Sequence, residues 1–312
     1  MVFSPIVIRQ NQAGRGRAPS VGRRKASRLW IALVLAGAAG GCLNPPVTVF
    51  QQLSEARRLT ADLLVQFIKA GDAANRAVMA DTDDTSAAFA REATQATLAA
   101  QRDVDALKPL LVDLDYSNET RLLEEFTQRF AEYRGLDRNI IDLAVENTNL
   151  KAQRLSFGPA RDAANEFRNA LEPISPTDAA NMWRVKALVA SAVANVREIE
   201  VLQAPHIAAA DEAAMTRLEQ RMAGEESEAR RAVEDLTRLV GLAARPQLAI
   251  AVAALDKFAG INTQIVSLSR RNSNVRSLAL SLGQKRNLTA ACEDSLRALE
   301  DALSKRGFTG TR

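Results

Sequence analysis

An acidic run is the pattern in this chain that comes nearest to a metal-binding motif. The run Asp81–Thr85 (DTDDT), with Glu92 at its twelfth position, faintly resembles a calcium-binding loop. That loop needs glycine at the sixth position, where this chain has Ser86, and often takes a ligand at the ninth, where it has Phe89. Short polar side chains also favour turns and helix N-caps. We therefore interpret the run as a solvated turn and predict no metal site.

His206 is the only histidine in the chain. It follows Pro205 in an expected helix connection, without the cysteines or carboxylates that would complete a metal site and without a placed nucleophile for a triad. The sequence also shows no glycine-rich phosphate loop, no Gly-x-Ser-x-Gly elbow and no paired catalytic carboxylates. We predict that the protein is not an enzyme and uses no cofactor.

Cys42 is the residue to which the sequence assigns a specific modification. The 13 uncharged residues Leu29–Gly41 (LWIALVLAGAAGG) have the length of a signal-peptide apolar region and are too few to span a bilayer. Small residues end this run directly before the cysteine. The pattern resembles a bacterial lipoprotein signal, in which the cysteine is diacylated and becomes the first mature residue. We therefore expect residues 1–41 to be a leader and Cys42 to carry a lipid.

The predicted location is the bacterial cell envelope, with the protein anchored to a membrane and facing the periplasm or exterior. Leu43 follows the cysteine, where aspartate commonly retains such proteins in the inner membrane, so the prediction leans towards the outer membrane. The alternative is an uncleaved single anchor from Leu29 to about Phe50, broken by Pro45 and Pro46. Whether Leu29–Gly41 is cleaved or retained stays open.

The basic character of the chain comes from the leader. The first 41 residues carry seven of the 41 basic residues and none of the 37 acidic ones, so 34 basic residues face 37 acidic ones in the remainder. That remainder has no basic excess with which to neutralise phosphates, which argues against a nucleic-acid partner.

A long internal repeat organises the rest of the chain. Leu136–Gly158 (LDRNIIDLAVENTNLKAQRLSFG) aligns without a gap on Ile261–Gly283 (INTQIVSLSRRNSNVRSLALSLG). A repeat of this length indicates one structural unit used twice. Cys292 aligns with Phe167 in this register, so we expect a small buried apolar residue and no disulfide.

Apolar residues recur every three or four positions from Val47 onward, with alanine and leucine dominant and aromatic residues only 4% of the chain. We predict an all-α fold of two tandem antiparallel four-helix, up-and-down bundle units with long amphipathic helices. The first unit covers 47–173 and the second 175–306, with Pro173 and Pro176 bracketing the break. Periodicity leaves open whether the units lie end to end or side by side.

One helix over 119–172 would be roughly 80 Å long at 1.5 Å per residue. We therefore predict a hairpin turn at Glu146–Asn149, repeated at Asn272–Asn274. Asn147 and Asn272 lie on the apolar stripe, and we interpret them as turn residues, the alternative being a polar layer that binds a ligand. Arg270 and its neighbour Arg271 fit a helix C-terminus, and an anionic-ligand role is the weaker alternative.

Several stretches of both copies resemble a known family of sensor domains. They are Arg76–Glu92 and Phe130–Ser156 in the first copy, with Asn195–Leu218 and Phe258–Ser281 in the second. They resemble the four-helix-bundle ligand-binding domain of methyl-accepting chemotaxis proteins, in two tandem copies. The resemblance implies sensing of small molecules outside the cell. No motif aligns with that family's binding arginines, so the ligand-binding residues are unknown.

The family passes its signal through a second membrane span, and we find no apolar run after Cys42 that is long enough for one. We predict a membrane-anchored extracytoplasmic sensory or ligand-binding module that lacks its own transmitter and acts through a partner. We expect the protein to contact the membrane through its anchor. We also expect it to bind a signalling membrane protein or to associate with a second copy through coiled-coil helices. The alternative function is a structural envelope lipoprotein that serves as a helical spacer or scaffold.

Overall fold

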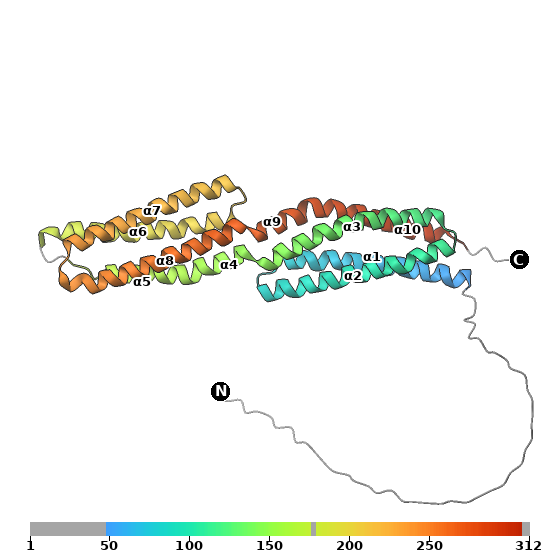
Figure 1. The fold of residues 1–312 in the computed structure, drawn as a ribbon, viewed down its shortest axis with the longest axis horizontal. Helices are drawn as coiled ribbons and strands as arrows, with labels where there is room; N and C mark the ends of the chain where they lie inside the picture. The colour runs from blue at the N-terminus through green and yellow to red at the C-terminus, as the bar shows by residue number, and fades with distance from the viewer. Residues whose placement is uncertain (1–47, 176–178, 308–312) are drawn as a thin grey trace, which may run out of the picture. The chain divides into compact units, whose positions relative to one another are not determined.

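The computed structural model describes residues 48–175 and 179–307, within a compact unit that spans Val47–Arg312. Every regular element of these residues is a helix (Figure 1), so the predicted all-α class is confirmed for the described part of the chain. The leader 1–41 and Cys42 lie outside the described residues.

Ten α-helices make up most of the described chain, interrupted by two π-helical segments. The helices are α1 (Val49–Val78), α2 (Asp83–Asp113), α3 (Ser117–Glu146), α4 (Thr148–Leu155), α5 (Arg161–Leu171), α6 (Met182–Ala208), α7 (Glu212–Leu239), α8 (Arg245–Arg271), α9 (Ser273–Leu280) and α10 (Arg286–Lys305). The π-helical segments are η1 (Ser156–Ala160) between α4 and α5, and η4 (Ser281–Lys285) between α9 and α10.

Polar residues cap the N-termini of the first two helices. Thr48 forms a capping box with Gln51 at the start of α1. Thr82 caps α2, because its side chain accepts a hydrogen bond from the Thr85 amide at 3.2 Å. Asp83 and its neighbour Asp84 fall in the first turn of α2, where the helix dipole stabilises negative charge. The acidic run therefore has a structural role as the start of a helix.

The predicted hairpin turn at Glu146–Asn149 is wrong. Asn147 is left-handed, with φ 50° and ψ 37°, and α4 begins at the next residue. The chain does not reverse there, because α3 packs on α9 and α10 whereas α4 packs on α8 (Figure 1). Asn272, with φ 53°, makes the same junction between α8 and α9. A helical hairpin needs a loop of about two to five residues, and a single left-handed residue redirects the helix without reversing it.

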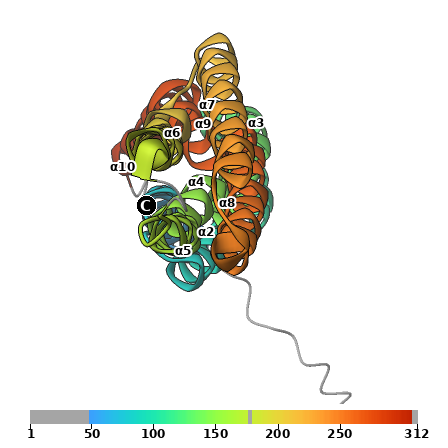
Figure 2. The same cartoon turned by 90° about the vertical axis from the view of Figure 1, so that its left-hand side faces the viewer.

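The helices consequently pack in two four-helix groups that differ from the predicted units. The first group contains α1, α2, α3 and α10, and the second contains α5, α6, α7 and α8, which surround a common core (Figure 2). Each group takes its fourth helix from the other repeat. The predicted boundaries 47–173 and 175–306 therefore do not separate the packing units, because α10 completes the core around α1 and α3 while α5 completes the core around α6 and α8.

The two copies of the repeat meet each other at these junctions. The Thr148 amide donates to Ser273 Oγ at 3.1 Å, and the Ser273 amide donates to Thr148 Oγ1 at 3.0 Å. The amides of Asn149 and Asn274 exchange the same kind of bond with each other's side-chain oxygens, both at 3.1 Å. In such an isologous contact each partner uses the same surface. We call residues 146–149 and 271–274 the seam.

Asn147 and Asn272 are turn residues, as predicted, and they also belong to a layer of polar side chains. Asn147 and Asn272 have the left-handed backbone of turn residues, and both are buried. The side chain of Asn274 donates to Asn147 Oδ1 at 2.9 Å, and that of Asn149 donates to Asn272 Oδ1 at 2.8 Å. A polar layer does exist here, and most of its hydrogen bonds join its own members, although Asn147 Nδ2 has no partner among the described residues. The ligand-binding alternative stays a prediction.

One described stretch, within Leu242–Lys305, is long and apolar enough by composition alone to cross a membrane, and 33% of it is buried in the protein. This corrects the expectation that no run after Cys42 reaches that length. The evidence for a span is weak, because the core helix of a soluble protein meets the same criterion.

Candidate functional site

A cavity of about 570 Å³ opens between α1 and the segment formed by α9, η4 and α10. Its walls are largely apolar, and several of the apolar side chains at its edge are exposed to solvent. Pockets of roughly 300–1,000 Å³ with apolar walls and a few placed polar groups are typical of small-molecule sites. The apolar residues that line it are Phe67, Ile68, Val78, Met79, Leu278 and Leu282.

The side chain of Lys285 is the unusual member of this lining. It sits at the last position of η4 and is only 2% exposed. Its Nζ lies 2.6 Å from Asp137 Oδ1 on α3 and 5.5 Å from the centre of the Tyr133 ring. Lys285 therefore lines the cavity, whereas its buried partner Asp137 lies outside the lining. π-helical segments such as η4 often mark functional sites.

Several polar atoms of this cluster lack a directed hydrogen bond. Lys285 Nζ, Asp137 Oδ1 and Tyr133 Oη are buried and make none with any described residue. The Lys285–Asp137 contact is therefore an ion pair without the hydrogen-bond geometry that would satisfy both groups. Lysine carries three donors, so the Lys285 ammonium keeps donor capacity beyond its contact with Asp137.

Burial changes the pKa of two of these groups, Asp137 and Tyr133. It raises the pKa of Asp137 above its ordinary value, and the Lys285 ammonium opposes that rise without cancelling it. It also raises the pKa of Tyr133, and the neighbouring Asp137 carboxylate adds to the effect. Both shifts follow from the burial of these side chains, of which Tyr133 is fully buried and Asp137 nearly so.

The glycine at position 71 helps to keep the cavity open. A Cβ atom built on Gly71 would lie 3.7 Å from Tyr133 Oη, and Gly71 itself lines the cavity. An alanine would fit at ordinary contact distance, whereas a longer side chain would enter the cavity.

The equivalent position in the second group contains no charge. In the repeat register Asn262 corresponds to Asp137 and Ser156 to Ser281. Ser156 Oγ donates to Gln203 Oε1 at 2.6 Å, and Gln203 Nε2 donates to Asn262 Oδ1 at 2.9 Å. The same place in the repeated unit can thus be filled by a neutral chain of hydrogen bonds. The fold itself does not require the Lys285–Asp137 pair.

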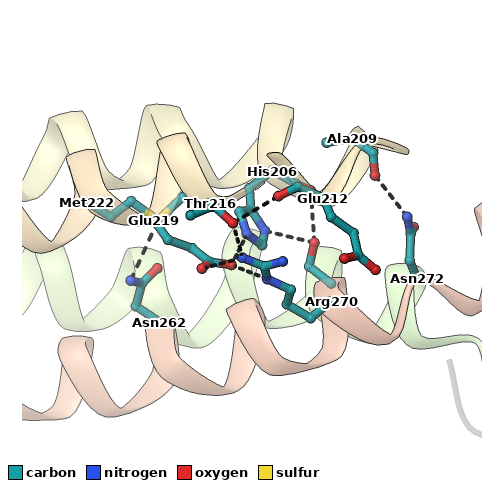
Figure 3. A network of polar contacts seen from close by, with 10 residues as sticks. His206, Ala209, Glu212, Thr216, Glu219, Met222, Asn262, Arg270 and Asn272 are labelled. Atoms are coloured by element: carbon teal, nitrogen blue, oxygen red, sulfur yellow. Dashed lines mark hydrogen bonds and ion pairs between the residues drawn. The ribbon is translucent and has the colours of Figure 1, made fainter. Parts of the chain in front are cut away.

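A larger polar network occupies the second group (Figure 3). His206 is fully buried, with Nδ1 2.8 Å from Ser269 Oγ and Nε2 2.8 Å from Glu219 Oε1. Arg270 binds the same carboxylate through Nε at 2.6 Å, and it also donates to the Thr216 hydroxyl. Arg270 lowers the pKa of Glu219, with a smaller contribution from His206. These groups satisfy one another, which favours a structural role.

The residues singled out by sequence fall into this pattern. Arg270 pairs with Glu219, and Arg271 pairs with Glu146 at 2.6 Å across the seam, so both arginines have partners within the protein. Cys292 is fully buried, and burial raises the pKa of its thiol to about 12, which confirms the prediction of a small buried residue. Among the described residues no His, Cys, Asp or Glu cluster has the arrangement of a metal site.

Sequence reasoning did not identify Asp137 and Lys285 as a site. The available signal was a charged residue on an apolar stripe in each of two helices, but the residues lie in different copies of the repeat. Comparison with known protein families, with curated proteins and with solved structures finds no match to this chain.

Proposed function

We propose that this protein is a membrane-anchored extracytoplasmic sensory or ligand-binding module, of chemoreceptor-like four-helix type, that acts through a partner protein. The observation that carries the proposal is Lys285, which lines the cavity beside α1 and forms a buried ion pair with Asp137. A concave apolar pocket with a few placed polar groups is the default candidate for a binding site. The lipoprotein-like sequence before Cys42 supports the membrane anchor.

The placement of the pair supports a binding role over a purely structural one. Two charges taken out of water lose hydration energy that their mutual attraction often fails to restore, so well-packed neutral residues are frequently as stable or more stable. The second four-helix group has the neutral solution at the equivalent place. The charges in the first group are therefore better explained by a ligand than by stability.

The topology offers a route from the site to the rest of the protein. The cavity wall joins α1 of the first repeat to η4 and α10 of the second. α10 continues through η4 and α9 to the seam, where the two repeats exchange hydrogen bonds. A ligand that draws η4 towards α1 would favour one arrangement of this junction over another, which is how binding energy shifts a conformational equilibrium.

The proposal is tested by a thermal-unfolding screen of the full chain against amino acids, organic acids and metal ions. We expect at least one small molecule to raise the unfolding temperature of the wild type, because a ligand that binds only the folded state stabilises it. Gly71→Leu, which fills the cavity, should abolish that shift. Gly260→Leu is the matched control, since Gly260 on α8 is exposed and a Cβ atom added there meets no atom within 4 Å.

A shift that survives Gly71→Leu would place the ligand elsewhere and remove the role of this cavity. The absence of any shift across the screen would remove the sensory function and favour the alternative of an envelope scaffold. Cross-linking in cells then separates the two functions by partner, because a signalling membrane protein supports the first and peptidoglycan or assembly components support the second.

A further inference from the structure

The charges around the cavity beside α1 indicate the chemistry of its ligand. Two acidic residues of the lining are already paired with arginines, Asp72 with Arg76 at 3.7 Å and Glu293 with Arg297 at 2.7 Å. Two cations also belong to the lining, Lys285 and Arg286. The acidic groups at the mouth are thus neutralised by residues of the protein, whereas the cations are less completely matched.

Arg286 has no acidic partner among residues 48–175 and 179–307. It is the first residue of α10, is exposed, and follows Lys285 directly in the chain. Lys285 has one carboxylate partner, Asp137, and the N–H donors of its ammonium group lack hydrogen-bond acceptors. The two adjacent cations at this cavity thus have one carboxylate partner in total, that of Asp137. This leaves positive charge and hydrogen-bond donors for a ligand.

The remaining walls select for an apolar body. Phe67 on α1 is fully buried beneath the cavity, while Ile68 and Leu282 line it with roughly half or more of their surface exposed. Leu278 and Met79 extend this apolar rim, and the Met79 side chain is 81% exposed. Apolar side chains gathered around the mouth of a pocket are typical of a binding surface. A ligand with an apolar body would cover them and remove them from water.

We propose that this cavity binds a small organic acid with an apolar body, whose carboxylate pairs with Lys285 and Arg286. The inference rests on the proposed binding function and adds the class of ligand. The carboxylate supplies the acceptors that the Lys285 ammonium and the Arg286 guanidinium lack, and charge-assisted hydrogen bonds of this kind are among the stronger ones in proteins. The alkyl or aryl part packs on the apolar walls.

The ligand's carboxylate shares Lys285 with Asp137. In the absence of ligand, Asp137 alone holds the Lys285 ammonium in place. Because a second carboxylate next to Asp137 is unfavourable in a buried site, binding should weaken the contact between α3 and η4. The proposed ligand is therefore coupled to the position of η4 relative to α3.

The test is a calorimetric titration of the full chain with three compounds that share one apolar chain: hexanoate, hexan-1-ol and hexylamine. We expect hexanoate to bind more tightly than the alcohol, and the amine to bind least, because only the acid pairs with both cations. Arg286→Gln should weaken hexanoate binding roughly tenfold or more. Arg276→Gln, another exposed arginine but outside the cavity lining, is the matched control and should leave the affinity unchanged.

A second variant keeps the proposal testable if single changes at the buried pair do not fold. Asp137→Asn combined with Lys285→Gln removes both buried charges together and should fold while losing hexanoate binding. Equal binding of the amine and the acid, or wild-type affinity in both Arg286→Gln and the double variant, would overturn the ligand class.

The ligand class and the binding function fail in distinguishable ways. If a compound without an acidic group stabilises the wild type more than its matched acid does, and Gly71→Leu abolishes its effect, the binding function stands and the organic-acid class is overturned. If no compound of any class binds, both are overturned together.

Discussion

The buried pair formed by Asp137 and Lys285 should behave as a strongly coupled unit in stability measurements. Their side chains are only 4% and 3% exposed, and their charged atoms are 2.6 Å apart. Removing one partner leaves a buried charge without compensation, which costs about 3–5 kcal/mol. We therefore expect Asp137→Asn or Lys285→Gln alone to lower the free energy of unfolding by about that amount.

The double variant should recover most of the loss. Replacing both members of a buried ion pair by neutral residues of similar size is often neutral or stabilising, by about 1–4 kcal/mol. The Ser156–Gln203–Asn262 chain shows that neutral polar side chains are accommodated at the equivalent place. The coupling free energy from the double-mutant cycle should thus be about 3 kcal/mol or more.

Urea unfolding at pH 7, followed by circular dichroism, measures all four proteins. The surface pair Glu166 and Lys257, with side chains 49% and 57% exposed, is the control and should show a coupling below about 1 kcal/mol. Additive losses at Asp137 and Lys285 would refute the reasoning, because they would mean that the two charges do not depend on each other in the folded protein.

Three further predictions concern other parts of the molecule. Arg306 lowers the pKa of Glu119 in the folded protein. The wild type should therefore be more stable than Glu119→Gln at pH 7, and acid-unfolding curves should show this difference disappear as the pH falls below about 4. Thr148→Ala and Ser273→Ala should each cost about 1–3 kcal/mol in urea unfolding, and equally, because their buried bonds are reciprocal; a large difference would contradict that symmetry. In cells given radioactive palmitate, the wild-type protein should become labelled and the Cys42→Ser protein should not. Equal labelling of both proteins would remove the lipid anchor from the proposal.

Local sequence signals predicted the helices because those signals act within a few residues. The three- and four-residue spacing of apolar side chains placed Leu63 and Phe67 in the core, where both are buried. The polar run before α2 begins that helix through Thr82. The repeat also predicted matching junctions, and Asn147 and Asn272 do adopt the same left-handed backbone.

The path of the chain after each junction could not be predicted from the same signals. A left-handed asparagine ends one helix whether the next helix reverses or continues, so its identity carries no information about direction. The deciding contacts are those between the two copies, such as Thr148 with Ser273. The site was hidden for the same reason: Asp137 and Lys285 meet only because α10 packs against α3 of the other repeat.

The exchange of helices between the two groups leads to a prediction that separates this fold from two independent tandem units. A protease site placed between residues 175 and 179 would cut the chain between the repeats. Tandem units with boundaries at 173 and 175 would then part, because each would retain its own core. In the observed packing, each fragment contributes one helix to the other fragment's core, α5 to the second group and α10 to the first.

We therefore expect the cut protein to remain a single species in native gel filtration and to separate only when unfolded. Apolar burial supplies the attraction: the helix α10 alone places Cys292, Leu296, Leu299 and Leu303 in the first core, all fully buried. Exposing this buried apolar surface would cost about 25 cal/mol per Å². Cutting the peptide chain between residues 175 and 179 exposes none of it, so the fragments should stay together. Elution of two folded fragments after cleavage would show that the fourth helices are not exchanged, and the link from the cavity through η4 to the seam would lose its basis.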